Sequence, residues 1–119
     1  MSRYPGLTLR VLAGDVPAMG PGRARLVSLI ASTGSIAAAA REMGMSYRRA
    51  WQLVDALNAS FREPLVVTAV GGARGGGAIV TGFGERVVEE YYRMESKASA
   101  VIVADLRKYA RHLKGPSGT

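Results

Sequence analysis

The chain of 119 residues contains no cysteine and a single histidine. The lack of cysteine excludes disulfide bonds, thiolate metal sites and cysteine nucleophiles, and it fits a cytoplasmic protein. His112 lies in a basic stretch near the C-terminus, and we interpret it as a surface residue rather than a general base or a ligand. The nine carboxylates show no metal-site spacing. We therefore predict no enzyme activity, no metal and no cofactor.

Long apolar runs are also missing. No segment is long enough to span a bilayer, and residues 1–14 lack the apolar core of a signal peptide. Positive charge is abundant instead, with 16 Lys and Arg against 9 Asp and Glu and a net charge of +7. This balance suits an anionic partner such as nucleic acid, an acidic protein or a membrane surface, although a domain that is merely basic has the same composition.

Hydrophobic residues make up 48% of the chain, enough for one small core. We predict a single domain over residues 1–114 and a disordered tail over residues 115–119. Residues 7–12 alternate between apolar and polar side chains, which predicts a half-buried strand with Leu7, Leu9 and Val11 inward. The Gly- and Pro-rich residues 14–22 predict a loop.

Three helices should follow. The first begins at Arg23, with Leu26, Leu29 and Ile30 on one face, and stops at Gly34. Ser35 predicts the N-cap of a short alanine-rich helix that ends at Gly44, and Ser46 predicts the N-cap of a third helix limited by Pro64. The inward residues of the third helix should be Ala50, Leu53, Val54, Leu57 and Phe61.

A β-hairpin and a long helix complete the pattern. Residues 65–70 predict one strand and residues 78–81 its return. The seven residues 71–77 include five glycines and predict an irregular tip, which carries Arg74. Thr81 predicts the cap of a last helix over residues 83–113, although Gly82 and Gly84 weaken its first turn. A shorter helix ending near Ala98 is the alternative.

The fold class predicted is mainly α with a small β-hairpin wing: a winged helix-turn-helix with an N-terminal strand, a DNA-binding core over residues 23–84 and a long C-terminal dimerisation helix. A helix-turn-helix needs small residues where its helices touch, and basic or polar side chains at the start of the second helix, which enters the major groove. The chain meets both requirements. An ordinary helical hairpin with a solvated arginine face is the alternative reading.

The candidate recognition helix spans residues 46–60. Arg48 and Arg49 can bind guanine edges or phosphates, Gln52 can pair with adenine, and Ser46 and Tyr47 can bind phosphate. The remaining candidate DNA contacts are Ser35, Arg74 on the wing, and Arg23 and Arg25 as phosphate ligands. Trp51 fits either packing beneath the helix or a position near the DNA backbone.

The last helix carries an apolar stripe with four-three spacing, and a rod of about 45 Å cannot be covered by so small a domain. We therefore predict a homodimer through this helix. The stripe consists of Val87, Tyr91, Met94, Ala98, Val101, Ile102, Leu106 and Tyr109, continuing to Leu113. Charged residues between Arg86 and Lys97 should form ion pairs on its solvated surface.

From about Gly22 to Tyr92 the sequence resembles the N-terminal DNA-binding domain of the ModE-type molybdate-responsive transcriptional regulators, a winged helix-turn-helix of the LysR kind. The landmarks are Gly34-Ser35-Ile36, Ala38-Ala39-Ala40, Met45-Ser46-Tyr47-Arg48-Arg49-Ala50-Trp51, Leu57-Asn58, Gly71-Gly72, Gly75-Gly76-Gly77-Ala78 and Thr81 with Gly84. The resemblance implies that the helix starting at Ser46 reads DNA beside a glycine-rich wing, and that the flanking helices dimerise.

Full-length members of that family carry C-terminal molybdate-binding domains, for which a chain ending at Thr119 leaves no room. We therefore expect double-stranded DNA and a second copy of the chain as partners, with molybdate sensed, if at all, by a separate partner protein. Two alternatives stay open: a small oxyanion-binding protein that uses residues 71–77 as an anion nest, and an interaction adaptor that does not bind DNA.

Overall fold

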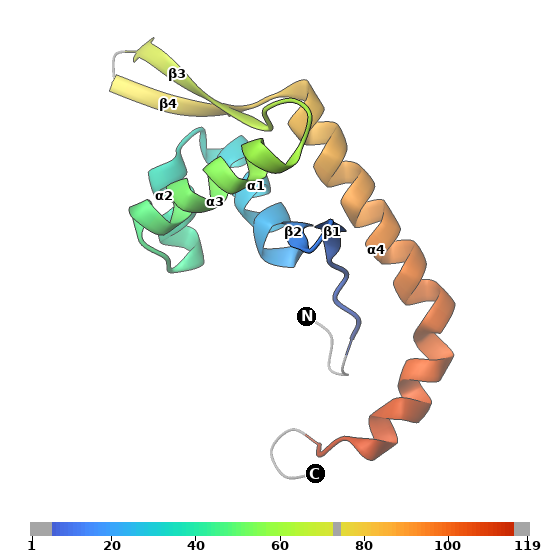
Figure 1. The fold of residues 1–119 in the computed structure, drawn as a ribbon. Coiled ribbons are helices and arrows are strands. Elements are labelled where there is room, and N and C mark those ends of the chain that lie inside the picture. Colours follow the sequence, from blue (N-terminus) through green and yellow to red (C-terminus); the bar gives the residue numbers. More distant parts are fainter. Residues whose placement is uncertain (1–5, 73–74, 116–119) are drawn as a thin grey trace.

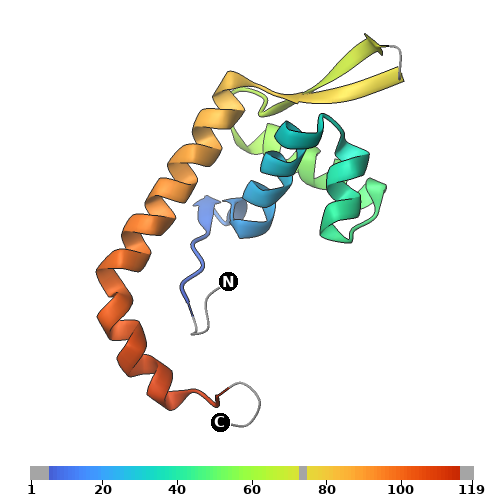
Figure 2. The same cartoon turned by 180° about the vertical axis from the view of Figure 1, so that it is seen from behind.

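Three short helices and a β-hairpin form the body of the molecule, and one long helix leaves it (Figures 1 and 2). The computed structural model describes residues 6–72 and 75–115. The elements are β1 (Val11–Ala13), β2 (Val16–Met19), α1 (Pro21–Thr33), α2 (Ile36–Met43), α3 (Tyr47–Ser60), β3 (Val66–Gly72), β4 (Gly75–Val80), α4 (Gly82–Tyr109) and a 3-10 turn at Ala110–His112. This is a winged helix-turn-helix, mainly α with one small hairpin as its wing, and it confirms the predicted fold class.

Two glycines and two serines set the boundaries of α1, α2 and α3. Gly34 and Gly44 adopt left-handed conformations, with φ of 69° at both, and end α1 and α2. The Ser35 hydroxyl accepts a hydrogen bond from the Ala38 N–H at 3.0 Å, and the Ser46 hydroxyl accepts one from the Arg49 N–H at 3.0 Å. Both predicted N-caps are therefore confirmed.

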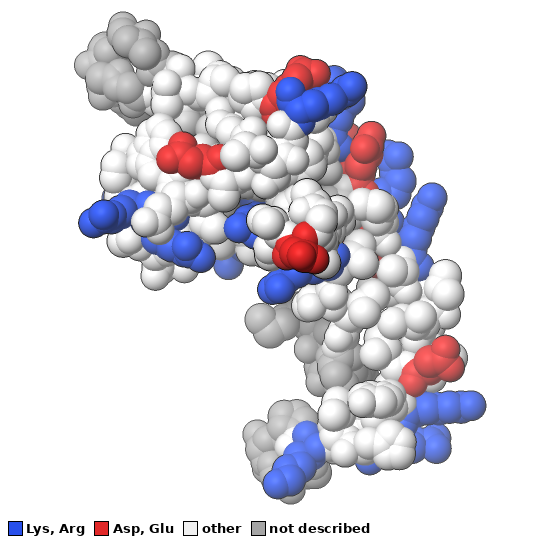
Figure 3. Space-filling view, viewed as in Figure 1, with Lys and Arg blue, Asp and Glu red and all other residues white. Residues whose placement is uncertain are grey.

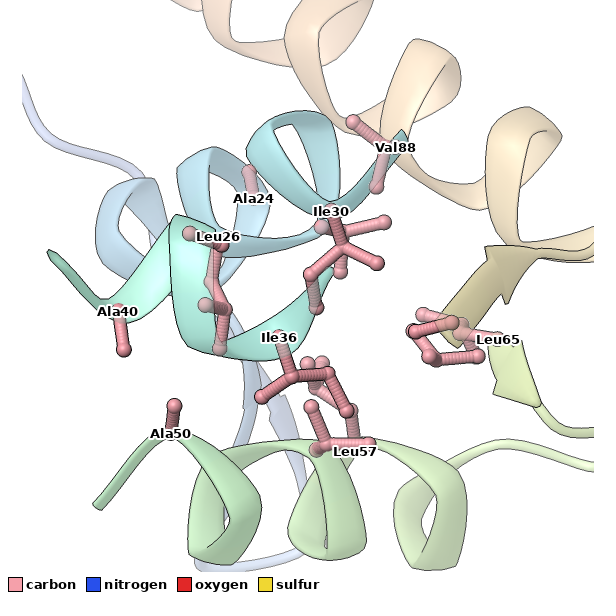
Figure 4. Packing of buried hydrophobic residues seen from close by; sticks show 14 of the residues in the cluster. Ala24, Leu26, Ile30, Ile36, Ala40, Ala50, Leu57, Leu65 and Val88 are labelled. Carbon is pink, nitrogen blue, oxygen red and sulfur yellow. The ribbon is translucent and has the colours of Figure 1, made fainter. Parts of the chain in front are cut away.

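The core lies where α1, α2 and α3 meet the base of the wing and the start of α4. Figure 4 shows Ala40 of α2 and Ala50 of α3 facing each other, so the absence of larger side chains brings the two helices together. The fully buried side chains include Leu26, Ile30, Val54, Leu57 and Leu65. Leu53 and Phe61, which were predicted to point inward, are only partly buried against this cluster.

The N-terminal segment differs from the prediction in its hydrogen bonding. Leu7, Leu9 and Val11 are half-buried and their neighbours exposed, so the predicted faces are right, yet residues 6–10 pair with no strand. The predicted loop is instead part of a hairpin, in which β1 pairs antiparallel with β2 across a turn where Gly14 has a φ of 65°. Pro17 fits in β2 because a two-stranded sheet has only edge strands.

The wing is fixed to the helices on both sides of its base. Asn58 of α3 donates from Nδ2 to the Val66 carbonyl at 2.9 Å, and its Oδ1 accepts from the N–H groups of Leu65 at 2.8 Å and Val66 at 3.2 Å. On the other strand, the Ala78 N–H donates to the Gly34 carbonyl at 3.0 Å. The hairpin and the turn after α1 therefore form one unit.

The glycine-rich tip is more regular than predicted. Its pairing runs from Val66 opposite Val80 to Gly72 opposite Gly75, with a register shift after Ala69. Five of the seven residues 71–77 belong to strands, so the prediction of an irregular segment is wrong for them. Backbone ladder bonds hold these glycines, because cross-strand hydrogen bonding offsets their low strand preference.

A close backbone approach seats the start of α4. The Thr81 hydroxyl accepts from the Gly84 N–H at 2.9 Å, which confirms the predicted cap, and donates to the Pro64 carbonyl at 2.8 Å. Gly84 lies against the Leu65 carbonyl so tightly that a Cβ there would overlap it. The glycine that was expected to weaken the helix is needed for this contact.

The second half of α4 extends past the body (Figures 1 and 2). The molecule measures 55 × 31 × 23 Å with a radius of gyration of 16.9 Å, whereas a compact chain of this length would have about 13.5 Å. The helix runs to Tyr109, so the alternative of a helix ending near Ala98 is wrong. Apart from Gly115, the predicted tail lies outside the described residues.

Candidate nucleic-acid interface

The N-terminal half of α3 presents polar side chains on the side opposite the core. Ala50, Val54 and Leu57 are buried, whereas Arg48, Arg49 and Gln52 are exposed. At about 100° per residue, Arg48 and Gln52 lie on neighbouring turns of one face. Figure 3 shows Lys and Arg side chains on the part of the body that α2 and α3 form. No element within residues 6–72 and 75–115 covers these side chains, so they are accessible to a ligand.

The hydroxyl groups of both capping serines already take part in one hydrogen bond each, as acceptors. Ser46 is exposed and Ser35 is half-buried, and each oxygen accepts a backbone N–H. The hydroxyl hydrogen of each stays available, because an oxygen that accepts one hydrogen bond can still donate another. Ser46 therefore has the better exposure for donating to an anion at the start of α3.

The arginines predicted as further phosphate contacts differ in their exposure to solvent. Arg25 is exposed, whereas Arg23 is half-buried and its Nε is buried without a hydrogen-bond partner. Arg74, the predicted wing contact, lies outside the described residues. Of the two arginines that the structure describes, Arg25 is the one whose side chain is open to solvent.

Sequence reasoning missed Asp55 on the same exposed face of α3. It follows Gln52 by three residues, about one helical turn, and is exposed. A carboxylate two turns from Arg48 on this face repels an anionic ligand and can accept a hydrogen bond from a cytosine amino group. The helical spacing from Arg48 and Gln52 would have identified it.

Trp51 and Tyr47 form an aromatic pair on the flank of α3 that faces β3. Their ring centroids lie 6.3 Å apart at an interplanar angle of 82°, an edge-to-face contact. The Trp51 side chain is half-buried and packs against the core, while Tyr47 is 55% exposed. Of the two readings of Trp51, packing beneath the helix is therefore the one that the structure favours.

The predicted apolar stripe of α4 divides into two parts. Tyr91 is only 1% exposed and donates a hydrogen bond from its hydroxyl to the Leu9 carbonyl at 2.6 Å. Burial, followed by the charge of Glu95, raises the pKa of Tyr91 to about 12. Because Tyr91 belongs to the core of its own chain, it is not part of an exposed surface, and its assignment to dimerisation is corrected.

The other stripe residues are accessible to different degrees. Val101 is 81% exposed, Tyr109 63% and Met94 46%. The partly buried members of the stripe are Val87, Ala98, Ile102 and Leu106. Val87 and Met94 also line a groove of about 470 Å³ with Phe61 and Phe83. The apolar surface thus continues from this groove along the part of α4 that leaves the body.

The predicted ion pairs on α4 do not form in the part of the chain that the structure describes. There, one pair of opposite charges approaches to 4.0 Å, between Arg62 Nε and Glu63 Oε2, and both side chains are largely exposed. The charged side chains between residues 86 and 97 are exposed except for Glu95, which is half-buried with its Oε2 3.3 Å from the Tyr91 hydroxyl. Within residues 6–72 and 75–115, no three His, Asp or Glu side chains gather as metal ligands, and none of the described helices is apolar enough to cross a membrane.

Comparison with known proteins agrees with this geometry. MopA of Rhodobacter capsulatus, a molybdenum-pterin-binding protein, is 46% identical over 87 residues, which cover 73% of this chain and 33% of MopA. MopB from the same organism is 43% identical over 84 residues, covering 71% of this chain and 31% of MopB. ModE of Escherichia coli strain K12, a DNA-binding transcriptional dual regulator, is 36% identical over 88 residues, covering 71% and 34%. The chain spans about a third of the length of these curated relatives.

These matches confirm the resemblance to ModE-type regulators for most of the chain. The model of a family of bacterial regulatory proteins matches residues 23–85, which include α1 from its third residue, α2, α3, the wing and the start of α4. The segment from Ser46 to Gln52 thus begins the second helix of a helix-turn-helix, rather than belonging to an ordinary helical hairpin. The chain belongs to the bacterial regulatory helix-turn-helix proteins of the lysR family.

Proposed function

We propose that this protein binds double-stranded DNA sequence-specifically, as a homodimer, and regulates transcription. The observation that carries the proposal is the exposed start of α3, where Arg48, Arg49 and Gln52 project from the second helix of a helix-turn-helix. In such motifs the start of this helix enters the major groove, where Arg pairs with guanine and Gln with adenine.

The flanking groups suit the DNA backbone. Ser46 and Tyr47 stand at the first turn of α3 with exposed polar side chains, and Arg49 lies about 100° around the helix from Arg48, on the side away from Tyr47. Phosphate contacts of this kind set the register of a protein on DNA without reading its sequence. The wing, with Arg74, is placed in this proposal on the adjacent backbone or minor groove.

The dimer proposal rests on the outer half of α4. A helix of 28 residues is about 42 Å long, and its outer half exposes Val101 and Tyr109 to solvent. A second copy of the same helix would cover this apolar surface. Tyr91 has no part in it, and the proposed contacts are Met94, Ala98, Val101, Ile102, Leu106 and Tyr109, with Val87 at the edge of the groove.

Charge along α4 favours an antiparallel arrangement of the two helices. Residues 85–95 contain four acidic and two basic side chains, whereas residues 97–114 contain one acidic and five basic ones. An antiparallel pair brings the acidic part of each helix beside the basic part of the other, while a parallel pair opposes like charges. The groove beside Val87 and Met94 would then lie near the outer end of the partner's helix.

The proposed dimer is tested by its mass. Ile102→Asp places a charge within the stripe and should convert a particle of about twice the chain mass of 12.6 kDa into a monomer in sedimentation equilibrium. Val103→Asp is the matched control, because Val103 lies about 100° farther around the helix and should leave the dimer intact. If the wild-type protein sediments as a monomer, the dimer proposal is wrong.

DNA binding is tested by pull-down of genomic fragments followed by sequencing. We expect a recurrent near-palindromic motif whose half-sites lie about one helical turn, ~34 Å, apart, or farther if α4 widens the spacing. The double variant Arg48→Ala, Arg49→Ala should lose this binding and make the salt dependence shallower, because fewer counterions are released. Arg107→Ala, on the last turn of α4, is the folded control that should retain the motif.

The molybdenum named for the relatives suggests the effector to test first. Five of the seven residues 71–77 are paired strand, an arrangement that does not favour an anion nest at those positions. We therefore propose that any response to molybdate reaches this domain from a separate sensing partner. Equilibrium dialysis of the purified chain should show no molybdate uptake, and stoichiometric uptake would instead support the oxyanion-binding alternative. Retention of a partner protein by a chain that binds no DNA would support the adaptor alternative.

A further inference from the structure

Trp51 is the only tryptophan of the chain, and it packs against the core from a flank of α3 that is separate from the exposed arginine face. It follows Tyr47 by four positions, so the two side chains lie on the same flank of α3, one turn apart. Their edge-to-face contact has a centroid distance of 6.3 Å and an interplanar angle of 82°. Aromatic pairs with this geometry restrict each other's orientation beyond simple burial.

The indole lies where α3 and the wing are joined. Trp51 lines an open groove of about 390 Å³ between α3 and β3, together with Val66, Val67 and Thr68. Two turns farther along the same flank, Asn58 makes its three hydrogen bonds to the start of the wing. The Trp51 ring therefore lies beside both elements that are expected to contact DNA.

Tyr47 is the more exposed member of the pair. It is the first residue of α3 and is 55% exposed, with the Trp51 ring as its aromatic neighbour. Side chains on a helix tilt toward its N-terminus, so the phenol of Tyr47 lies near the N-terminal end of α3. The hydroxyl thus lies on the wing side of the Arg48 face, where DNA backbone would pass between the helix and the wing.

We propose that Trp51 is a positioning residue that holds the Tyr47 hydroxyl in place to donate a hydrogen bond to a DNA phosphate on the wing side of α3. This inference rests on the proposed DNA binding. Trp51 acts through Tyr47 and has no DNA contact of its own. The pair fixes the lateral position of the backbone, and Arg48 and Gln52 then meet the base edges in a defined register.

A double-mutant cycle tests the inference, with dissociation constants measured for the selected operator. Tyr47→Phe removes the hydroxyl and should weaken binding by about threefold to tenfold, a loss of the size that one neutral hydrogen bond supports. Trp51→Leu should weaken it by a similar factor, and the double variant should be no weaker than either single variant. Trp51→Phe keeps an aromatic ring and should restore most of the affinity.

The salt dependence separates this role from a structural one. Tyr47→Phe and Trp51→Leu should shift affinity equally at every salt concentration, because a neutral phenol releases no counterion, whereas Arg49→Ala should change the slope. Circular dichroism monitors folding, and Trp51→Met replaces Trp51→Leu if the leucine variant unfolds.

Two results would overturn the inference. Additive losses in the double variant would mean that Trp51 does not act through Tyr47, and an unchanged affinity in Tyr47→Phe would mean that the hydroxyl meets no phosphate. Failure of the proposed function is distinguishable, since the wild-type protein would then bind no DNA at all.

Discussion

Replacing Gly84 by alanine tests how α4 is seated on the body. A Cβ at this position would overlap the Leu65 carbonyl oxygen and lie 3.0 Å from its carbon. Both groups are backbone atoms, so no rotamer change relieves the overlap. The helix must instead move by roughly half an ångström to one ångström, away from a seat that includes the buried Val88 and Tyr91.

The size of the effect follows from two opposing terms. Overpacking of a well-filled site costs up to about 3 kcal/mol, and alanine in place of glycine in a helix contributes about 1 kcal/mol of stability. We expect the free energy of unfolding to fall by about 2 kcal/mol. For a chain of this length that lowers Tm by roughly 8 °C, at about 4 °C per kcal/mol.

Gly82→Ala is the matched control in the same turn of the helix. A Cβ there would meet only the Arg86 Nη1, at 3.8 Å, so the substitution should raise Tm by a few degrees. Thermal unfolding by circular dichroism must be compared at equal protein concentration, because association shifts Tm. If Gly84→Ala unfolds at the same temperature as Gly82→Ala, the account of this seat is wrong.

Three further variants probe other parts of the fold and the interface. Asn58→Ala removes the acceptor of the Leu65 and Val66 N–H groups and should lower the free energy of unfolding, measured by urea denaturation, by about 2–3 kcal/mol. A decrease of less than about 1 kcal/mol would contradict the proposed role of Asn58 in fixing the wing. Tyr91 has its pKa raised to about 12 when folded, whereas unfolded tyrosine ionises near 10. The unfolded state thus loses this proton first, stability should fall as pH rises from 10 to 12, and Tyr91→Phe should flatten that part of the pH profile. Asp55→Asn removes a negative charge from the exposed face of α3 and should tighten operator binding about twofold to fivefold in a mobility-shift titration at low salt; weaker binding would instead indicate that Asp55 accepts a hydrogen bond from a base.

The helix boundaries were predictable because their causes are local. Ser35 and Ser46 cap the N–H groups three residues ahead, and Gly34 and Gly44 adopt the left-handed conformation that ends a helix. Each signal involves a few neighbouring residues, and no tertiary contact competes with it. The exposed arginines of α3 follow directly from these boundaries and from the helical period.

Pairing between strands was less predictable, because it depends on contacts between separate segments. Alternation at Leu7, Leu9 and Val11 correctly gave the buried face, yet a period of two reports only extended backbone and cannot say whether a partner strand exists. The Leu9 carbonyl finds its partner in Tyr91, 82 residues away. Strand β2 was not predicted because it contains Pro17, and proline is tolerated only in edge strands. Whether a strand lies at an edge cannot be read from the sequence.

Long-range contacts also give two residues a different role from the one predicted. Tyr91 matched the spacing of the apolar stripe but is buried in its own chain, since helical spacing identifies a face without identifying what covers it. Gly84 looked like a weak point of α4, and only the position of Leu65 shows why a side chain is excluded there. Both outcomes depend on where α4 begins relative to β3, which a single sequence does not specify.

The two attachments at the base of the wing have a consequence for how related proteins diverge. Asn58 fixes β3, and the Gly34 carbonyl fixes β4, so the hairpin is anchored before its glycine-rich end begins. Adding or removing one residue from each strand beyond these anchors would change the reach of the wing by about 3.3 Å while leaving the helices undisturbed. Wing length is therefore a property that evolution, or an engineer, can alter independently of the recognition helix.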